Sequence, residues 1–206
     1  MVQSMTDAQE DPELRRLMDE YVQSILARNR SAPIIGEFIV SFSHMQASIE
    51  DAVVEIVGKD AKILLAGERG PEASRSEMSF RHLLTGRAQS DAARRVIKLF
   101  HGEVNELTQY RNRIAHDAWR FSGDTQEASI ERRSPKGCTE VQLIDLVELK
   151  DRAEQCMLLG LMARPLAAAV PMSDDDRGGW SIDELFVIDE RGRLVMSLPL
   201  VPKPEG

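Results

Sequence analysis

The feature that most constrains the fold is a long run of apolar residues spaced three and four positions apart. This spacing predicts a helix from about residue 91 to residue 116 or 119 with one face in a core, and Ser90 and Asp91 favour a helix start. Gly102 lies inside this helix at a cost of about 1 kcal/mol relative to alanine, so we expect a close packing contact there. The apolar members of the run are Ala93, Val96, Ile97, Phe100, Val104, Leu107, Ile114 and Ala115.

One charged residue interrupts this apolar face. Arg111 follows Leu107 by four positions, where an apolar residue is expected. Burying an unpaired guanidinium costs several kcal/mol as an order of magnitude, so Arg111 needs a partner, a wet cleft or an interface. Asn112 and His116 are four residues apart and share a face, whereas Arg111 and His116 are rotated by roughly 140°. Arg111 and His116 can therefore converge where the helix ends, or where two copies of the segment meet.

Composition and charge narrow the class of protein. The 206 residues are 42% hydrophobic and 29% charged, which is ordinary for a globular domain with appendages. The net charge of −8 argues against a surface built for non-specific nucleic-acid or membrane binding, although residues 87–120 hold seven basic and four acidic side chains. Cys138 and Cys156 lack metal-ligand spacing, and no cofactor motif is present. Without a signal core or a membrane-length apolar run, the sequence favours a cytoplasmic location.

Further elements surround this helix. Asp11 and Pro12 predict a helix that ends near residue 30, residues 31–33 a break, and 33–57 a long second helix. A short helix is expected over 78–84, and residues 119–124 and 128–132 predict either a short β-hairpin or two irregular arms. A last helix follows, which Pro165 limits or kinks, with either a Thr139 cap or a strand before it. Residues 184–189 and 193–198 predict a β-hairpin, which must dock on the bundle or a partner. We expect three segments: 1–32, 33–170 and 171–206.

A family resemblance follows from these residues. Residues 111–116 read Arg-Asn-Arg-Ile-Ala-His, with Trp119 just after them. An arginine, a polar neighbour and a histidine a few positions later, near the end of a long helix, resemble the motif of the HEPN superfamily and of one bacterial HEPN-like branch. The resemblance covers about residues 34–168. It implies an all-α fold, a HEPN-like bundle of about four or five helices with a small β excursion after the motif helix, here followed by the C-terminal β-hairpin tail.

The resemblance also implies an activity. Active HEPN proteins are metal-independent endoribonucleases of toxin or phage-defence type, in which a homodimer brings two Arg-His pairs into one cleft. His116 would then transfer the proton, Arg111 would hold the phosphate, and Asn112 would orient these groups. Arg113 and Arg120 could add contacts to the RNA backbone. RNA would be the substrate, 2′,3′-cyclic phosphate ends the product, and an inhibitory protein a possible partner.

A second interpretation keeps the fold without the catalysis. Arg111 could instead be salt-bridged inside the bundle, for example to Glu50, with His116 capping the C-terminal end of its helix. The protein would then be a helical module that binds a protein partner or a nucleotide in the same groove. The two interpretations differ in whether Arg111 and His116 are exposed in one cleft.

Overall fold

The computed structural model describes residues 12–58, 72–121, 128–133 and 139–197. The chain is mostly helical, as predicted, and its strands form two small antiparallel sheets. Its contacts divide it into two units, one formed by residues 1–36 and 112–150 and the other by residues 37–111 and 151–206. The three segments expected from the sequence remain a prediction. Cys138 lies outside the described residues.

Helix α1 (Pro12–Val57) is continuous, and the predicted break at residues 31–33 is wrong. Pro33 lies inside the helix, where a proline removes one backbone donor at a cost of about 3 kcal/mol. The helix continues because many turns on both sides propagate cooperatively once they are formed. Ser31 is buried in this stretch, and its hydroxyl donates to the carbonyl of Ala27 at 2.9 Å.

The first unit contains a three-stranded antiparallel sheet in the order β1-β2-β3. Strands β1 (Ala118–Phe121) and β2 (Ala128–Arg133) pair antiparallel and confirm the hairpin alternative for this segment. Strand β3 (Thr139–Ile144) confirms the strand alternative for the segment that follows. Helix α5 (Leu146–Ala169) begins after Asp145, whose carboxylate accepts the Val147 N–H at 2.8 Å. Pro165 lies inside α5, four residues before the helix ends at Ala169, so it does not stop the helix directly.

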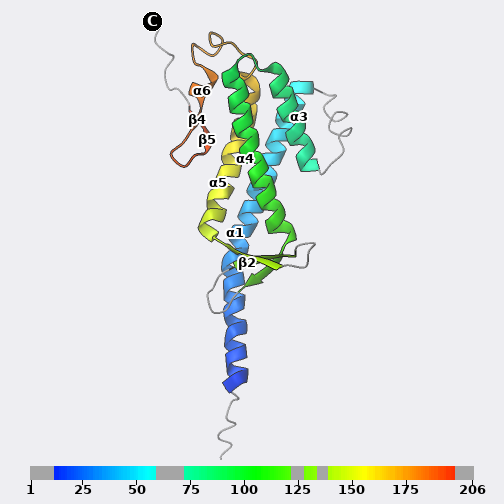
Figure 1. The fold of residues 1–206 in the computed structure, drawn as a ribbon, viewed down its shortest axis with the longest axis vertical. Coiled ribbons are helices and arrows are strands. Elements are labelled where there is room, and N and C mark those ends of the chain that lie inside the picture. The colour runs from blue at the N-terminus through cyan, green and yellow to red at the C-terminus, as the bar shows by residue number, and fades with distance from the viewer. Residues whose placement is uncertain (1–11, 59–71, 122–127, 134–138, 198–206) are drawn as a thin grey trace, which may run out of the picture. The chain divides into compact units, whose positions relative to one another are not determined.

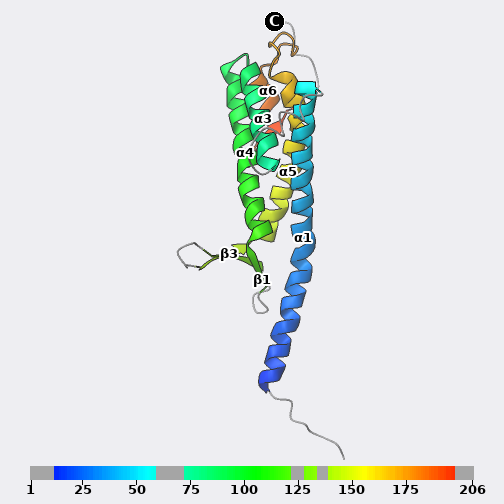
Figure 2. The ribbon, with the colours of Figure 1, turned by 90° about the vertical axis from the view of Figure 1, so that its right-hand side faces the viewer.

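The second unit is a helical bundle. Residues 37–57 of α1, α3 (Glu72–Arg87), α4 (Asp91–His116) and α5 lie side by side, and α4 runs antiparallel to the others (Figures 1 and 2). Helix α3 contains the predicted helix 78–84 but is longer on both sides. The core is aliphatic and aromatic. Its fully buried side chains include Phe38, Phe42, Met45, Ile49, Val53, Leu84, Leu107, Leu159 and Leu166.

The predicted tail hairpin is confirmed and packs on α4 within the second unit. It consists of β4 (Phe186–Ile188) and β5 (Leu194–Met196), and the short helix α6 (Ile182–Leu185) precedes it. The Glu103 carboxylate of α4 accepts the backbone N–H of Leu194, whose side chain is buried. The turn before the hairpin is not simply solvated, because the Arg177 guanidinium is buried and donates to the Trp180 carbonyl at 3.0 Å.

Two further observations concern the chain as a whole. Cys156 is buried in α5, as expected of a small core residue, and burial raises the pKa of its thiol to about 12. Within the described ranges, no helix combines the length and the hydropathy that a membrane crossing requires.

Candidate functional site

Helix α4 carries the motif, and its apolar face explains why it forms there. The Ser90 hydroxyl accepts the Ala93 N–H at 3.1 Å and caps the helix start. The predicted apolar residues are buried from Ala93 through Leu107 and again at Ile114. Ala115 is exposed, contrary to the predicted face.

Arg111 lies at the margin of this face rather than in its centre. Tyr110 is buried and continues the apolar spacing from Leu107 to Ile114, so the arginine does not occupy the core position that the sequence suggested. Arg111 is half-buried, and its guanidinium carbon lies 5.8 Å from the centre of the Phe42 ring. Such a contact favours a partly desolvated guanidinium. Arg111 is also the last residue of its segment in the second unit.

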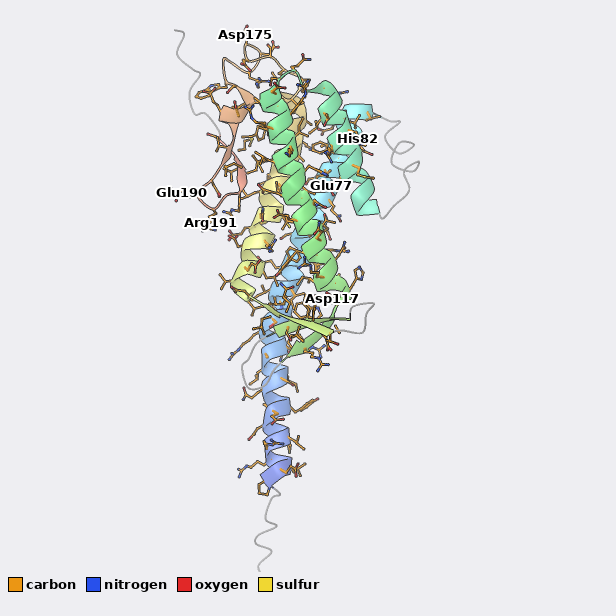
Figure 3. The ribbon with its side chains drawn as sticks, viewed as in Figure 1. Glu77, His82, Asp117, Asp175, Glu190 and Arg191 are labelled. Atoms are coloured by element: carbon orange, nitrogen blue, oxygen red, sulfur yellow. The ribbon has the colours of Figure 1, made fainter. Side chains whose placement is uncertain are left out.

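The remaining motif residues belong to the first unit. Asn112 and His116 are exposed and lie one turn apart on α4, as predicted, and His116 is the last residue of the helix. Arg113 is exposed and its Nη1 lies 3.5 Å from the side-chain oxygen of Gln142 on β3. Asp117, which is labelled in Figure 3, follows His116 directly and is half-buried. An amide and an imidazole thus share one solvent-facing surface.

The sheet holds the end of α4 in place. The Trp119 indole N–H donates to the Ile114 carbonyl at 2.9 Å, so this indole satisfies one of the last carbonyls of the helix. The Trp119 and Phe121 rings are stacked with their centres 6.0 Å apart. Arg120, predicted to contact substrate, forms an ion pair with Glu131 on β2. This pair uses the Nε of Arg120, and the nearby carboxylate weakens the attraction of its guanidinium for a phosphate.

A cavity of about 650 Å³ lies elsewhere, in the second unit. It is formed by α4, α5 and the β4–β5 turn, and its lining contains five cationic and three acidic side chains, including Arg191 of the turn (Figure 3). Asp151 Oδ1 accepts from Arg191 at 2.8 Å and from Arg193 at 3.1 Å, whereas Lys98 has no ion pair with the described residues. The predicted close contact at Gly102 is wrong, because this residue is exposed and borders the cavity.

Buried ionisable groups form a third cluster, between α3 and α4 of the second unit. Glu77 (Figure 3) is buried, and its Oε1 lies 2.7 Å from Nδ1 of His101. Burial raises the pKa of Glu77 to about 7 and, with Arg81 and His82 nearby, lowers the pKa of His101. Both directions favour a neutral pair in which the carboxyl carries the proton.

Sequence reasoning missed the cavity and this cluster. Arg95 and Lys98 belong to the basic residues of the range 87–120, but the other residues of the cavity wall, such as Asp151 and Arg191, are far away in the sequence. Among the described residues, no group of three or more His, Cys, Asp or Glu side chains is arranged to hold a metal ion.

Comparison of the chain with models of known protein families, with curated proteins and with solved structures finds no match. The resemblance to the HEPN superfamily therefore rests on the motif residues and their place near the end of α4.

Proposed function

We propose that the protein is a metal-independent endoribonuclease of HEPN type that acts as a homodimer in the cytoplasm. The observation that supports this most directly is the pair of exposed side chains of Asn112 and His116, one turn apart where α4 ends. The preceding Arg111 is half-buried against Phe42, which restrains its guanidinium without excluding it from water. An exposed imidazole and a restrained arginine are the groups that phosphodiester chemistry requires once a second chain brings them together.

The reaction would use the 2′-hydroxyl of RNA as the nucleophile. His116 would take the proton from this hydroxyl, whose oxygen attacks the adjacent phosphorus while the bond from phosphorus to the 5′-oxygen breaks. The leaving 5′-oxygen takes up a proton, and the products are a 2′,3′-cyclic phosphate and a 5′-hydroxyl end. Arg111 would stabilise the charge on the phosphate, and Asn112 and Arg113 would position the strand. DNA lacks the nucleophile and should be spared.

A second copy of the chain would bring an arginine and a histidine of the motif close together. On one ideal helix, Arg111 and His116 point roughly 140° apart, so one chain does not readily direct both groups at the same phosphate. Two motif helices around a two-fold axis would bring the arginine of one chain toward the histidine of the other.

The test is RNA cleavage in EDTA by the full chain and by Arg111→Ala and His116→Ala. We expect cyclic-phosphate ends from the wild type and a loss of about 100-fold or more in each variant. His44→Ala is the matched control, because His44 is an exposed helical histidine outside the motif, and it should cleave normally. Circular dichroism checks that all variants fold. Equal cleavage by wild type and His116→Ala would refute the assignment.

The cavity favours a second candidate function, a non-catalytic module that binds a nucleotide. Its volume of about 650 Å³ lies within the range of small-ligand sites, and Lys98 is placed to meet a phosphate. Calorimetric titration with nucleoside monophosphates would test this function. Lys98→Glu should abolish binding, whereas Arg94→Glu, on the same helix and paired with Asp91, should not. Binding that survives Lys98→Glu would refute it.

A further inference from the structure

The first half of α1 exposes a stripe of large apolar side chains. This segment belongs to the first unit, and seven of its large apolar residues are between 39% and 67% exposed. Six of them share one face of the helix, and the seventh, Leu26, lies roughly 40° beyond the edge of that face. Water is a poor environment for such a surface, and monomeric proteins rarely carry one that is so contiguous. We call it the α1 stripe, and its members are Leu14, Leu17, Met18, Tyr21, Val22 and Ile25.

The α1 stripe lies on one face of the helix, and the buried residues of the segment lie on another. At about 100° per residue, the six side chains fall within an arc of roughly 140°. Ala27 and Ser31 are buried, and the direction midway between them lies roughly 130° from the centre of this arc. Arg16 and Glu20 form an ion pair on the face opposite the stripe, with a separation of 3.7 Å. The segment is therefore amphipathic, and its apolar face is not the one that it buries within the chain.

The exposed area matches what a protein partner covers. Six large side chains that are about half exposed present on the order of 600 Å² of surface. One partner in a standard protein interface contributes about 800 Å². The polar face carries both Arg16 and Glu20, and Asp19 lies beside the stripe, so the segment lacks the uniformly basic polar face of a helix that binds anionic membranes.

The order of the stripe residues favours a second copy of the chain as the partner. Their spacing is three, one, three, one and three, which reads the same in both directions. If a second copy of the helix lies antiparallel, Leu14 faces Ile25, Leu17 faces Val22, and Met18 faces Tyr21. A symmetric dimer requires such a self-complementary patch, and antiparallel helices also oppose their dipoles favourably.

We propose that two copies of the chain associate through their α1 stripes, packed antiparallel about a two-fold axis between residues 19 and 20. This pairing requires no ribonuclease activity and uses a surface different from the motif on α4. Because the area is slightly below that of a standard interface, the dimer should form at micromolar concentrations and dissociate on dilution.

Sedimentation of the full chain over a range of concentrations tests the pairing. The mean mass of the wild type should rise above the chain mass of 23.1 kDa with a Kd in the micromolar range, and the part of this rise that depends on the α1 stripe should be lost in Met18→Asp. Met18→Asp places a carboxylate in the centre of the stripe and should raise the dimer Kd by about 100-fold or more. Gln23→Asp adds the same group on the far face of the same helix and should change the Kd by less than about threefold. Circular dichroism should show that both variants remain folded.

Disulfide trapping tests the orientation in a Cys138→Ser background. An equimolar mixture of Leu14→Cys and Ile25→Cys should give a mixed dimer, whereas Leu14→Cys alone should not crosslink, because the two copies of residue 14 are roughly 16 Å apart along the axis. A wild type that stays monomeric at about 100 μM would overturn the proposal. So would unchanged association of Met18→Asp, efficient crosslinking of Leu14→Cys alone, or stripe-dependent binding of the chain to phosphatidylglycerol vesicles.

Discussion

Two glycines inside helices of the second unit predict opposite responses to the same substitution. Gly102 in α4 is exposed, and a Cβ atom built on it meets no other atom within 4 Å. Gly160 in α5 faces α1, where a Cβ atom would lie 3.2 Å from the Met45 Cα and 3.4 Å from the Ser48 hydroxyl oxygen. Both positions should gain the same helix propensity from alanine, about 1 kcal/mol. Only Gly160 has a neighbour that must move.

The magnitudes follow from these contacts. Gly102→Ala should raise the free energy of unfolding by about 1 kcal/mol, because the change restricts the unfolded chain and creates no clash. At Gly160, overpacking against a helix backbone costs about 1–3 kcal/mol, which offsets the propensity gain and leaves a net loss of about 1 kcal/mol. For a chain of this size, 1 kcal/mol corresponds to about 2–4 °C in Tm.

Thermal and urea unfolding, followed by far-UV circular dichroism, measure the difference between the variants. We expect Gly102→Ala to unfold about 4–8 °C above Gly160→Ala, with the wild type between them. Since both glycines lie in the second unit, the comparison concerns one part of the chain. Equal shifts of the two variants would refute the reasoning, and a loss of stability in Gly102→Ala would show that an unrecognised group occupies the space beside it.

Other predictions concern the ionisable groups. Burial raises the pKa of Glu77 from 4.5 to about 7 in the folded chain, so its contribution to stability is complete below pH 4.5 and is lost as the pH rises to about 7. The free energy of unfolding, relative to that of Glu77→Gln, should therefore fall over this window. A difference that does not change with pH in urea melts would contradict this prediction. Glu103→Ala removes the acceptor of the Leu194 N–H and should cost about 1–3 kcal/mol, with faster hydrogen exchange in the tail hairpin. The buried Cys156 thiol, with its pKa raised to about 12, should react with a maleimide only on unfolding, and rapid labelling of the folded chain would oppose this.

The sequence predicted helices and strands well where many residues follow one regular spacing. The face of α4 from Ala93 to Leu107 was predictable because regular spacing fixes both the helix and its buried side. The two hairpins were predictable because β-prone runs flank turn residues. Pro33 misled the prediction of α1, since a local rule weighs the cost of one proline but not the many turns that propagate on both sides of it.

The candidate sites were less predictable because they depend on distant residues. The spacing placed Arg111 on the core face, but Tyr110 occupies that position. The two residues are neighbours on the helix, so the sequence pattern alone could not say which of them faces the core. That Asn112 and His116 share a face followed from their spacing, whereas their exposure did not. The cavity joins Lys98 to Arg191, and the Glu77–His101 pair joins α3 to α4, so no local pattern could indicate either.

The hydrogen bond from the Trp119 indole to the end of α4 has a spectroscopic consequence. The chain contains two tryptophans, Trp119 in the first unit and Trp180 in the second. Each unit therefore carries its own intrinsic fluorophore. In Trp180→Phe, the remaining emission would come from the indole that caps the motif helix, so RNA, a second chain or an inhibitor that disturbs this helix end would shift the spectrum. Trp119→Phe would report the docking of the tail in the same way.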